Sequence, residues 1–262
     1  MTVSLNGCAV HVERNPRKGA SHRVLLLHGW GCDGAIFSTI ASGLMEEADV
    51  TTLDFPGHGK SEEPPEPWGV PEYAEMTRQL IQREGLAPVD IVAHSFGARV
   101  AIYLSATWPD LVGKLAITGG AGIRPPATPE QARRQKRYKR YQALLGRLSA
   151  LPPLQKPVSH LQDALRQRYG SPDYIRLSEG MRKTFVKIVN LDLLPLLPRI
   201  NAPTLLIWGS DDTETPLWMG QAMEKSIQDA GLVVFERGSH FAFLEQWQRF
   251  LIIVKRFILE EP

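Results

Sequence analysis

The stretch "AHSFGA", residues 93–98, has the residue types and spacing of a turn that presents a nucleophilic serine. Ser95 lies between small residues at positions 93 and 97, as in a Gly-x-Ser-x-Gly motif, with alanine in place of the first glycine. In that motif a strand turns sharply into a helix and leaves the serine hydroxyl exposed at a strained backbone position. Because serine also starts ordinary helices, the stretch alone leaves both interpretations open.

Two later segments offer the partners that a nucleophilic serine needs. A serine hydroxyl attacks well only when a base takes its proton, and an acid must orient that base. The segment "WGSDDTETP" (208–216) contains Asp211 and Asp212, and "GSHFAF" (238–243) contains His240. Each follows a short apolar run, so both would lie where parallel strands end and their loops converge. Together the segments predict acyl transfer by Ser95 with His240 as the base.

A further segment, "LLLHGWGCD" (25–33), could supply donors that stabilise a tetrahedral intermediate. The negatively charged oxygen of such an intermediate needs two backbone N–H groups aimed at it. We expect one from Phe96, which follows the serine, and one from Trp30 in the early loop. The residues that are predicted to line the substrate pocket beside these groups are Gly29, Cys32 and Phe241.

The composition is that of an ordinary globular protein. With 262 residues, 43% hydrophobic and 22% charged, the chain can form one large α/β domain or a domain with an insertion. No apolar stretch approaches the ~20 residues of a membrane span, and the first residues lack the features of a secretory signal. The two cysteines form no disulfide framework, so we expect a cytoplasmic location. Metal-ligand spacings and phosphate-binding glycine loops are absent from the sequence, so neither a cofactor nor a metal is predicted.

Short apolar runs alternate with amphipathic segments, which is typical of a parallel sheet covered by helices on both faces. Strands are predicted over residues 23–29, 49–55, 89–94, 114–119, 203–209 and 232–237. Helices are predicted near residues 34–47, 71–84, 96–107, 216–230 and 243–259. The first residues alternate between apolar and polar types like an antiparallel hairpin at the sheet edge. The serine, acid and histidine segments each follow one of these strands.

Residues 123–190 form a compositionally distinct insert. They contain 15 Lys and Arg but 4 Asp and Glu, a charge of +11, whereas the rest has 15 and 24, a charge of −9. Capping patterns and no strand signal predict a helical lid, so that residues 1–122 and 191–262 form the core domain and 123–190 the lid. A stripe of Arg176, Lys183 and Lys187 would face either an anionic substrate or the solvent.

The combination of motifs resembles the α/β-hydrolase superfamily, in its lidded esterase-type branch. "HGWG" is similar to the family's oxyanion loop, "DFPGHGKS" (54–61) to its Asp-x-Pro-Gly-x-Gly-x-Ser loop, and the other segments to its nucleophile, acid and histidine loops. The resemblance implies a mostly parallel sheet flanked by helices and a triad of Ser95, Asp212 and His240. The family spacing from Gly209 to Pro216 favours Asp212 over Asp211 as the acid.

The motifs and the resemblance predict a serine hydrolase that cleaves a carboxylic ester of a small molecule through an acyl-enzyme intermediate. Hydrolysis of a thioester or of a C–C bond beside a ketone would use the same residues, and a non-catalytic small-molecule receptor is a further alternative. The basic stretch "RRQKRYKR" (133–140) is interpreted as a solvated lid face, because no nucleic-acid-binding motif accompanies it. We therefore expect no nucleic-acid or membrane partner, and the oligomeric state stays open.

Overall fold

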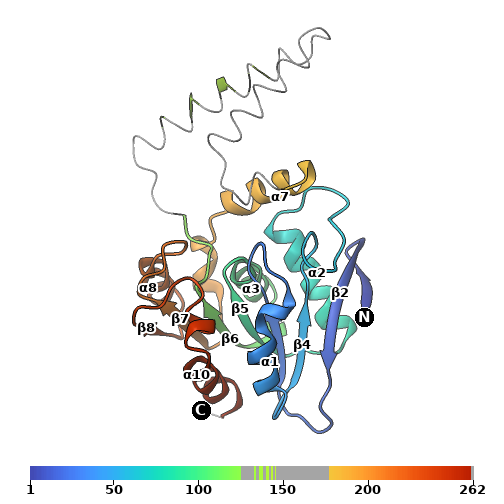
Figure 1. Ribbon diagram of the computed structural model, residues 1–262, viewed down its shortest axis with the longest axis vertical. Coiled ribbons are helices and arrows are strands. Elements are labelled where there is room, and N and C mark those ends of the chain that lie inside the picture. Colours follow the sequence, from blue (N-terminus) through green and yellow to red (C-terminus); the bar gives the residue numbers. More distant parts are fainter. Residues whose placement is uncertain are drawn as a thin grey trace. The chain divides into compact units, whose positions relative to one another are not determined.

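The computed structural model of the chain describes residues 1–124 and 177–260, together with positions 133, 136, 137, 140, 141, 143 and 145. The chain divides into two compact units, one of residues 1–124 and 183–262 and the other of residues 125–182. In the described part of the first unit, eight strands form one sheet with helices on both faces (Figure 1). The α/β architecture predicted from the sequence is confirmed.

The elements follow one another in the order that the apolar runs predict. The strands are β1 (Thr2–Leu5), β2 (Cys8–Asn15), β3 (Arg23–Leu27), β4 (Asp49–Leu53), β5 (Val89–His94), β6 (Val112–Thr118), β7 (Thr204–Gly209) and β8 (Ala230–Phe235). The α-helices are α1 (Ser38–Leu44), α2 (Val70–Arg83), α3 (Phe96–Thr107), α7 (Glu179–Asn190), α8 (Leu217–Ser226), α9 (Ala242–Glu245) and α10 (Trp247–Leu259). Short 3-10 helices are η1 (Gly34–Phe37), η2 (Pro109–Leu111) and η4 (Leu194–Arg199).

The sheet has the strand order β1-β2-β4-β3-β5-β6-β7-β8. β1, β2 and β4 pair antiparallel, which confirms the predicted N-terminal hairpin, and every later pair is parallel. All residues of β5 and β7 are buried, which explains their continuous apolar sequence. Because parallel strands end at the same edge, the loops after β3, β5, β6, β7 and β8 lie along that edge.

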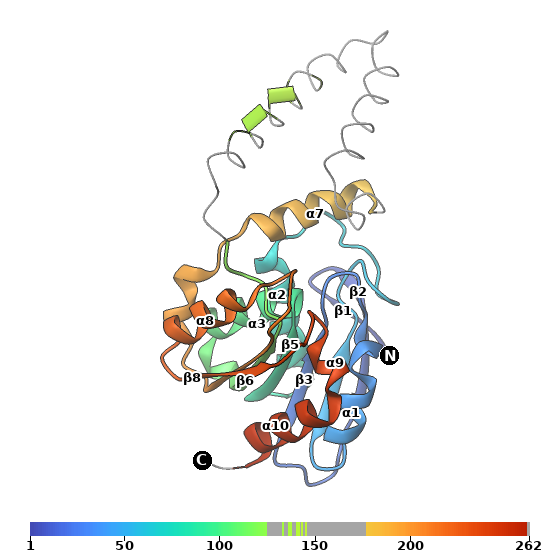
Figure 2. The same ribbon diagram turned by 60° about the vertical axis from the view of Figure 1, so that its left-hand side comes forward.

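Two apolar layers hold the helices against the sheet. One layer includes side chains of α2, α3 and α8, among them Leu80 and Val100, and the other includes those of α1, α9 and α10, among them Leu44 and Phe250. Figure 2 shows α1, α9 and α10 together on one side of the sheet. This packing fixes the start of α3, and with it the turn that contains Ser95.

The predicted lid lies mostly outside the described residues. Its last part is α7, of which residues 183–190 belong to the first unit. There Arg99 of α3 donates hydrogen bonds of 3.1 and 3.0 Å to the carbonyl oxygens of Ile188 and Leu191. The C-terminal end of α7 is therefore bound to the core, while the domain boundaries at 122/123 and 190/191 stay a prediction.

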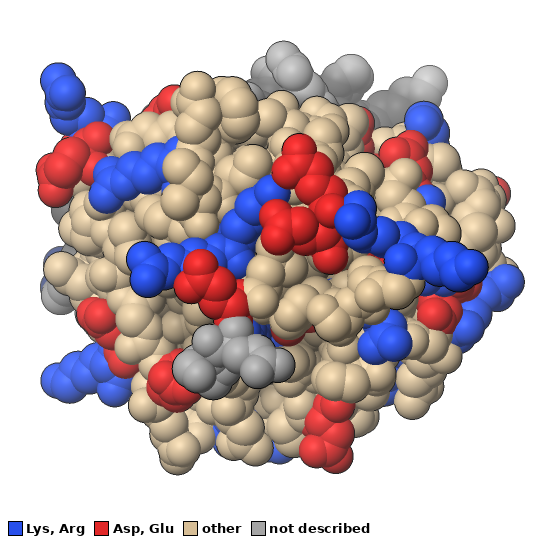
Figure 3. Space-filling model, turned by 90° about the horizontal axis from the view of Figure 1, so that it is seen from below, with Lys and Arg blue, Asp and Glu red and all other residues tan. Residues whose placement is uncertain are grey.

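The described surface carries charges of both signs. Figure 3 shows acidic and basic side chains next to each other on the face seen from below, where the loop between β2 and β3 lies. Elsewhere in the described residues, Lys255 Nζ lies 2.8 Å from Glu46 Oε2 and 2.9 Å from Glu47 Oε1. Among the helices that the structure describes, none has both the length and the apolar character needed to span a membrane.

Candidate active site

Ser95 stands at the turn between β5 and α3, since β5 ends at His94 and α3 begins at Phe96. Its backbone has φ 51° and ψ −108°, and a residue other than glycine adopts a positive φ only under constraint. The constraint comes from the end of β6, because Ser95 N–H donates to Thr118 O at 3.3 Å and Ser95 O accepts from Ala121 N at 3.1 Å. The predicted strand-turn-helix context of this serine is therefore confirmed.

Two glycines let the loop after β3 approach this turn. A Cβ on Gly97 would lie 2.2 Å from the carbonyl oxygen of Leu27, so only glycine fits there without a backbone shift. A Cβ on Gly29 would lie 2.9 Å from His94 Cδ2 and 3.3 Å from Ser95 Cβ. The segment expected to supply oxyanion donors thus packs directly against the serine turn.

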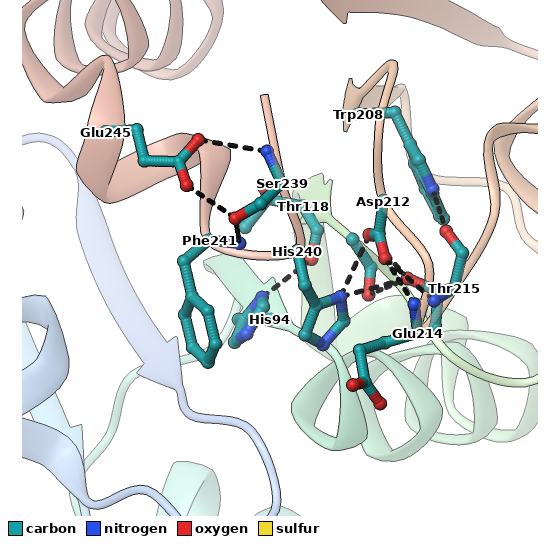
Figure 4. A network of polar contacts seen from close by, with 11 residues as sticks. His94, Thr118, Trp208, Asp212, Glu214, Thr215, Ser239, His240, Phe241 and Glu245 are labelled. Atoms are coloured by element: carbon teal, nitrogen blue, oxygen red, sulfur yellow. Dashed lines mark hydrogen bonds and ion pairs between the residues drawn. The ribbon is translucent and has the colours of Figure 1, made fainter. Parts of the chain in front are cut away.

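His240 and Asp212 form a direct pair in the loops after β8 and β7 (Figure 4). His240 Nδ1 lies 2.9 Å from Asp212 Oδ2, and the Asp212 side chain is fully buried whereas that of His240 is 12% exposed. The other carboxylate oxygen, Asp212 Oδ1, accepts hydrogen bonds of 2.9 Å from the N–H groups of Glu214 and Thr215. Backbone donors on one oxygen and the imidazole on the other fix the orientation of the carboxylate.

The surroundings of Asp212 favour its ionised form. Burial acts to raise its pKa, but the hydrogen bonds from His240 and Thr215 outweigh this effect, and the pKa lies below its ordinary value. An ionised carboxylate only accepts hydrogen bonds, so the proton between the two side chains belongs to His240 Nδ1. In the neutral ring, the lone pair is then on His240 Nε2, as a general base requires.

The adjacent Asp211 has a different environment. It is exposed, and its carboxylate accepts a hydrogen bond of 2.9 Å from Ser210 Oγ. The motif spacing favoured Asp212 over Asp211, and Asp212 is the residue that contacts His240.

The end of β6 connects the serine turn to the acid–histidine pair. Thr118 accepts the N–H of Ser95, and a Cβ on the next residue, Gly119, would lie 3.1 Å from His240 Nδ1 and 3.3 Å from Asp212 Oδ2. Within the part of the chain that the structure describes, the His240 ring bonds to the acid loop and no hydrogen bond joins it to the Ser95 hydroxyl. In ligand-free enzymes such a bond is often long and tightens when substrate binds.

His94, which precedes the serine, packs against His240 with ring centroids 4.7 Å apart (Figure 4). Burial, together with the nearby His240, lowers the pKa of His94 to about 3, so the ring is neutral near pH 7. Its Nδ1 lies 3.1 Å from Thr118 O and must carry the proton, since a carbonyl only accepts. An uncharged ring therefore borders the His240 imidazole.

His28 orders the loop that carries the expected oxyanion donors. Its Nε2 accepts from Phe55 N at 2.8 Å, so its proton is on Nδ1, which lies 2.7 Å from Gly29 O. Burial lowers the pKa of His28 to about 3, which keeps this arrangement neutral. Among the backbone hydrogen bonds of the described residues, none uses the N–H of Trp30 or of Phe96. The role of these two N–H groups as oxyanion donors stays a prediction.

The Trp30 ring belongs to an aromatic cluster that the sequence did not predict. Its centroid lies 4.7 Å from that of His58, 5.5 Å from that of Phe96 and 5.2 Å from that of Phe185. Phe185 comes from α7, a segment that the sequence assigned to the lid. A residue of that segment therefore contacts the candidate donor loop.

The predicted pocket residues lie beside these groups, but their role as a pocket lining stays a prediction. Phe241 is 38% exposed, and its ring centroid lies 5.2 Å from that of His94 and 5.4 Å from that of His240. Cys32 is half-buried, and its N–H donates to Gly29 O at 3.2 Å. A group of three or more metal-ligating side chains is not found among the described residues.

The predicted basic stripe is only partly described. Arg176 lies outside the described residues, and Lys183 is exposed. Lys187 Nζ donates to the carbonyl oxygen of Pro67 in the core unit. Lys187 is therefore already bound to a backbone oxygen, and the anionic-substrate hypothesis stays a prediction.

Two supports of the acid–histidine pair were missed in the sequence. Thr215 Oγ1 lies 2.9 Å from Asp212 Oδ2. The only sequence feature that could have indicated this contact is the position of Thr215 within the acid loop. Glu245 accepts from Ser239 N at 2.9 Å and from the Ser239 hydroxyl, which fixes the loop beside His240 (Figure 4). Ser239 and Glu245 have the types of a capping box, but they are six residues apart instead of three.

Two relatives align with most of this chain. Pimeloyl-[acyl-carrier protein] methyl ester esterase of Neisseria meningitidis serogroup A is 27% identical over 280 residues, covering 95% of this chain and 82% of the relative. The protein of the same name from Chromobacterium violaceum is 29% identical over 243 residues, covering 89% of this chain and 92% of the relative.

Solved structures and a family model identify the fold. The enol-lactonase from Burkholderia xenovorans matches with a TM-score of 0.75 and 21% identity, covering 99% of this chain and 100% of that one. An esterase from Exiguobacterium antarcticum matches with a TM-score of 0.74 and 22% identity, covering 99% of each chain. The model of the alpha/beta hydrolase family matches residues 24–251, which include the serine, acid and histidine segments. The chain therefore belongs to the alpha/beta hydrolase family of enzymes.

Proposed function

We propose that this chain is a carboxylic ester hydrolase with Ser95, His240 and Asp212 as its catalytic triad. The observation that carries the proposal is the 2.9 Å bond between His240 Nδ1 and buried Asp212, beside a serine with positive φ at a strand-to-helix turn. The names of the two relatives, both methyl ester esterases, support an ester as the bond that is cleaved.

In the proposed reaction, Ser95 Oγ attacks the ester carbonyl carbon while His240 Nε2 takes the hydroxyl proton. The carbonyl electrons move onto the oxygen, and the N–H groups of Trp30 and Phe96 stabilise that oxyanion. Collapse of the tetrahedral intermediate breaks the bond to the alcohol, which leaves with the proton from His240. Water then attacks the acyl-enzyme through the same base, which releases the carboxylic acid and regenerates Ser95.

We further propose that the substrate is the methyl ester of an acyl chain on a carrier protein, as in the relatives' names. The +11 charge of residues 123–190 supports a partner with an acidic surface, because complementary charge accelerates encounter. The basic residues among 123–190 would supply this attraction.

A carrier protein loaded with a pimeloyl methyl ester tests the proposal, because it contains a methyl ester and a thioester. We expect the purified protein to release methanol without releasing the carrier thiol, and Ser95→Ala to release neither. Ser95-dependent thiol release would identify a thioesterase instead. Saturable binding without turnover of either bond would identify a receptor.

A salt titration tests the carrier separately. With the carrier-bound substrate, kcat/KM should fall as the salt concentration rises, because salt screens attraction between the two proteins. A small free methyl ester is the control, and its kcat/KM should change little. Equal salt dependence for both substrates would contradict a charged carrier as the partner.

A further inference from the structure

We propose that Thr215 is a positioning residue whose hydroxyl keeps the acid and the base of the reaction aligned. The inference rests on the proposed function. Thr215 Oγ1 lies 2.9 Å from Asp212 Oδ2, 3.0 Å from Gly119 O and 3.2 Å from His240 Nδ1. The residue is 5% exposed, so its hydroxyl is largely shielded from solvent. One hydroxyl thus contacts the acid, the base and the loop after β6.

The hydroxyl completes the set of donors around Asp212. The carboxylate accepts from the N–H groups of Glu214 and Thr215 on Oδ1, and from His240 Nδ1 and the Thr215 hydroxyl on Oδ2. A carboxylate has about four acceptor positions, so all are used and any rotation would break a bond. Hydrogen bonds to an ionised group are about twice as strong as neutral ones, so Asp212 takes the hydroxyl proton in preference to Gly119 O.

The same hydroxyl can respond when His240 becomes charged. Once His240 Nε2 has taken the serine proton, Nδ1–H is the donor of an imidazolium and attracts electron pairs more strongly. The Thr215 hydroxyl can keep donating to Asp212 Oδ2, 2.9 Å away, and turn a lone pair toward Nδ1–H, 3.2 Å away. It therefore supports the pair both before and after proton transfer.

The backbone of Thr215 is itself held in place. Trp208 Nε1 donates to Thr215 O at 2.7 Å, and the Trp208 side chain is fully buried. The backbone N–H of Thr215 is bonded to Asp212. Because both its backbone groups are fixed, Thr215 presents its hydroxyl from a rigid position, as a positioning residue requires.

Three variants of Thr215 separate the hydroxyl from the packing. Thr215→Val keeps the size and removes the hydroxyl, and Thr215→Ala differs from Thr215→Ser in the hydroxyl alone. We expect kcat to fall about tenfold in the Val and Ala variants with KM unchanged, and Thr215→Ser to restore it to within about twofold. Thr213→Val, at an exposed threonine in the same loop, is the control and should be unaffected. Thermal unfolding of each variant checks that the fold is intact.

A double-mutant cycle tests whether Thr215 acts through the acid. In an Asp212→Asn background, Thr215→Val should cause no further loss, because the aligned pair is already broken. Three results would refute the role of Thr215. The first is a wild-type kcat in a folded Thr215→Val variant, and the second is equal activity of Thr215→Ser and Thr215→Ala. The third is a further tenfold loss when Thr215→Val is added to Asp212→Asn. Full activity of Ser95→Ala would instead refute the proposed function itself.

Discussion

Replacing Asp212 with asparagine would exchange one carboxylate oxygen for an NH₂ group at almost constant size. Since Asp212 Oδ1 accepts two backbone N–H groups, the amide oxygen must take that place, and the NH₂ group must face His240. An NH₂ group donates, so it pairs with His240 only when Nδ1 has no proton. The ring proton then lies on Nε2, where the serine proton should be accepted. The variant therefore stabilises the wrong tautomer of the base.

The expected loss in kcat is large for the exchange of a single atom. In the Ser-His-Asp triad of serine proteases, the same aspartate-to-asparagine change lowers kcat ~10⁴-fold. Each tenfold loss corresponds to ~1.36 kcal/mol, so the activation barrier rises by ~5.4 kcal/mol. Asp211→Asn is the matched control: it makes the same change at an exposed carboxylate, and its effect should stay within about twofold. Steady-state kinetics on a methyl ester, with circular dichroism to verify the fold, would measure both. A larger effect at Asp211, or ~10% residual activity in Asp212→Asn, would refute the reasoning.

Two further predictions follow from the glycine and histidine contacts. Gly97→Ala should lower kcat/KM about 100-fold, because its Cβ would meet Leu27 O at 2.2 Å and displace the start of α3; unchanged kinetics in a folded variant would contradict this. The pKa of His94 is about 3 in the folded protein, against an ordinary value of 6.5. Between pH 6.5 and 3 the unfolded chain therefore binds a proton at this residue that the folded protein does not. The free energy of unfolding falls as the pH falls through this range. Urea unfolding at pH 7, 6 and 5 would give the free energy of unfolding of the wild type and of His94→Gln. With falling pH, the variant should lose up to ~1.4 kcal/mol less of this free energy per pH unit than the wild type. An equal pH dependence of the two free energies would be evidence against a neutral buried ring.

Much of the site was predictable because its signals are local. β5 and α3 have the bounds expected from the sequence, since a buried apolar run, a small-x-Ser-x-small turn and a helical pattern follow one another without interruption. Asp212 and His240 were likewise placed by short motifs after apolar runs. The fold class followed from the same alternation of strands and helices.

The remaining features depend on contacts between distant segments. Thr215 meets His240 only because the loops after β7 and β8 converge, and Phe185 meets Trp30 only because α7 returns to the core. The neutral state of His94 depends on burial that no local pattern reports. Helix ends were also difficult: the segment predicted over 243–259 is divided into α9 and α10, and α8 ends at Ser226 instead of residue 230.

The central claim is that Ser95 is an activated nucleophile, and a fluorophosphonate probe tests it most directly, because such a probe reacts with serines whose proton a base can remove. The labelled protein would be digested and the adduct located by mass spectrometry, with Ser95→Ala and Asp212→Asn as comparisons. We predict a single adduct on the peptide that contains Ser95, no adduct in Ser95→Ala, and a strongly reduced labelling rate in Asp212→Asn. An adduct on another serine, or labelling of Ser95→Ala at the wild-type rate, would contradict the account.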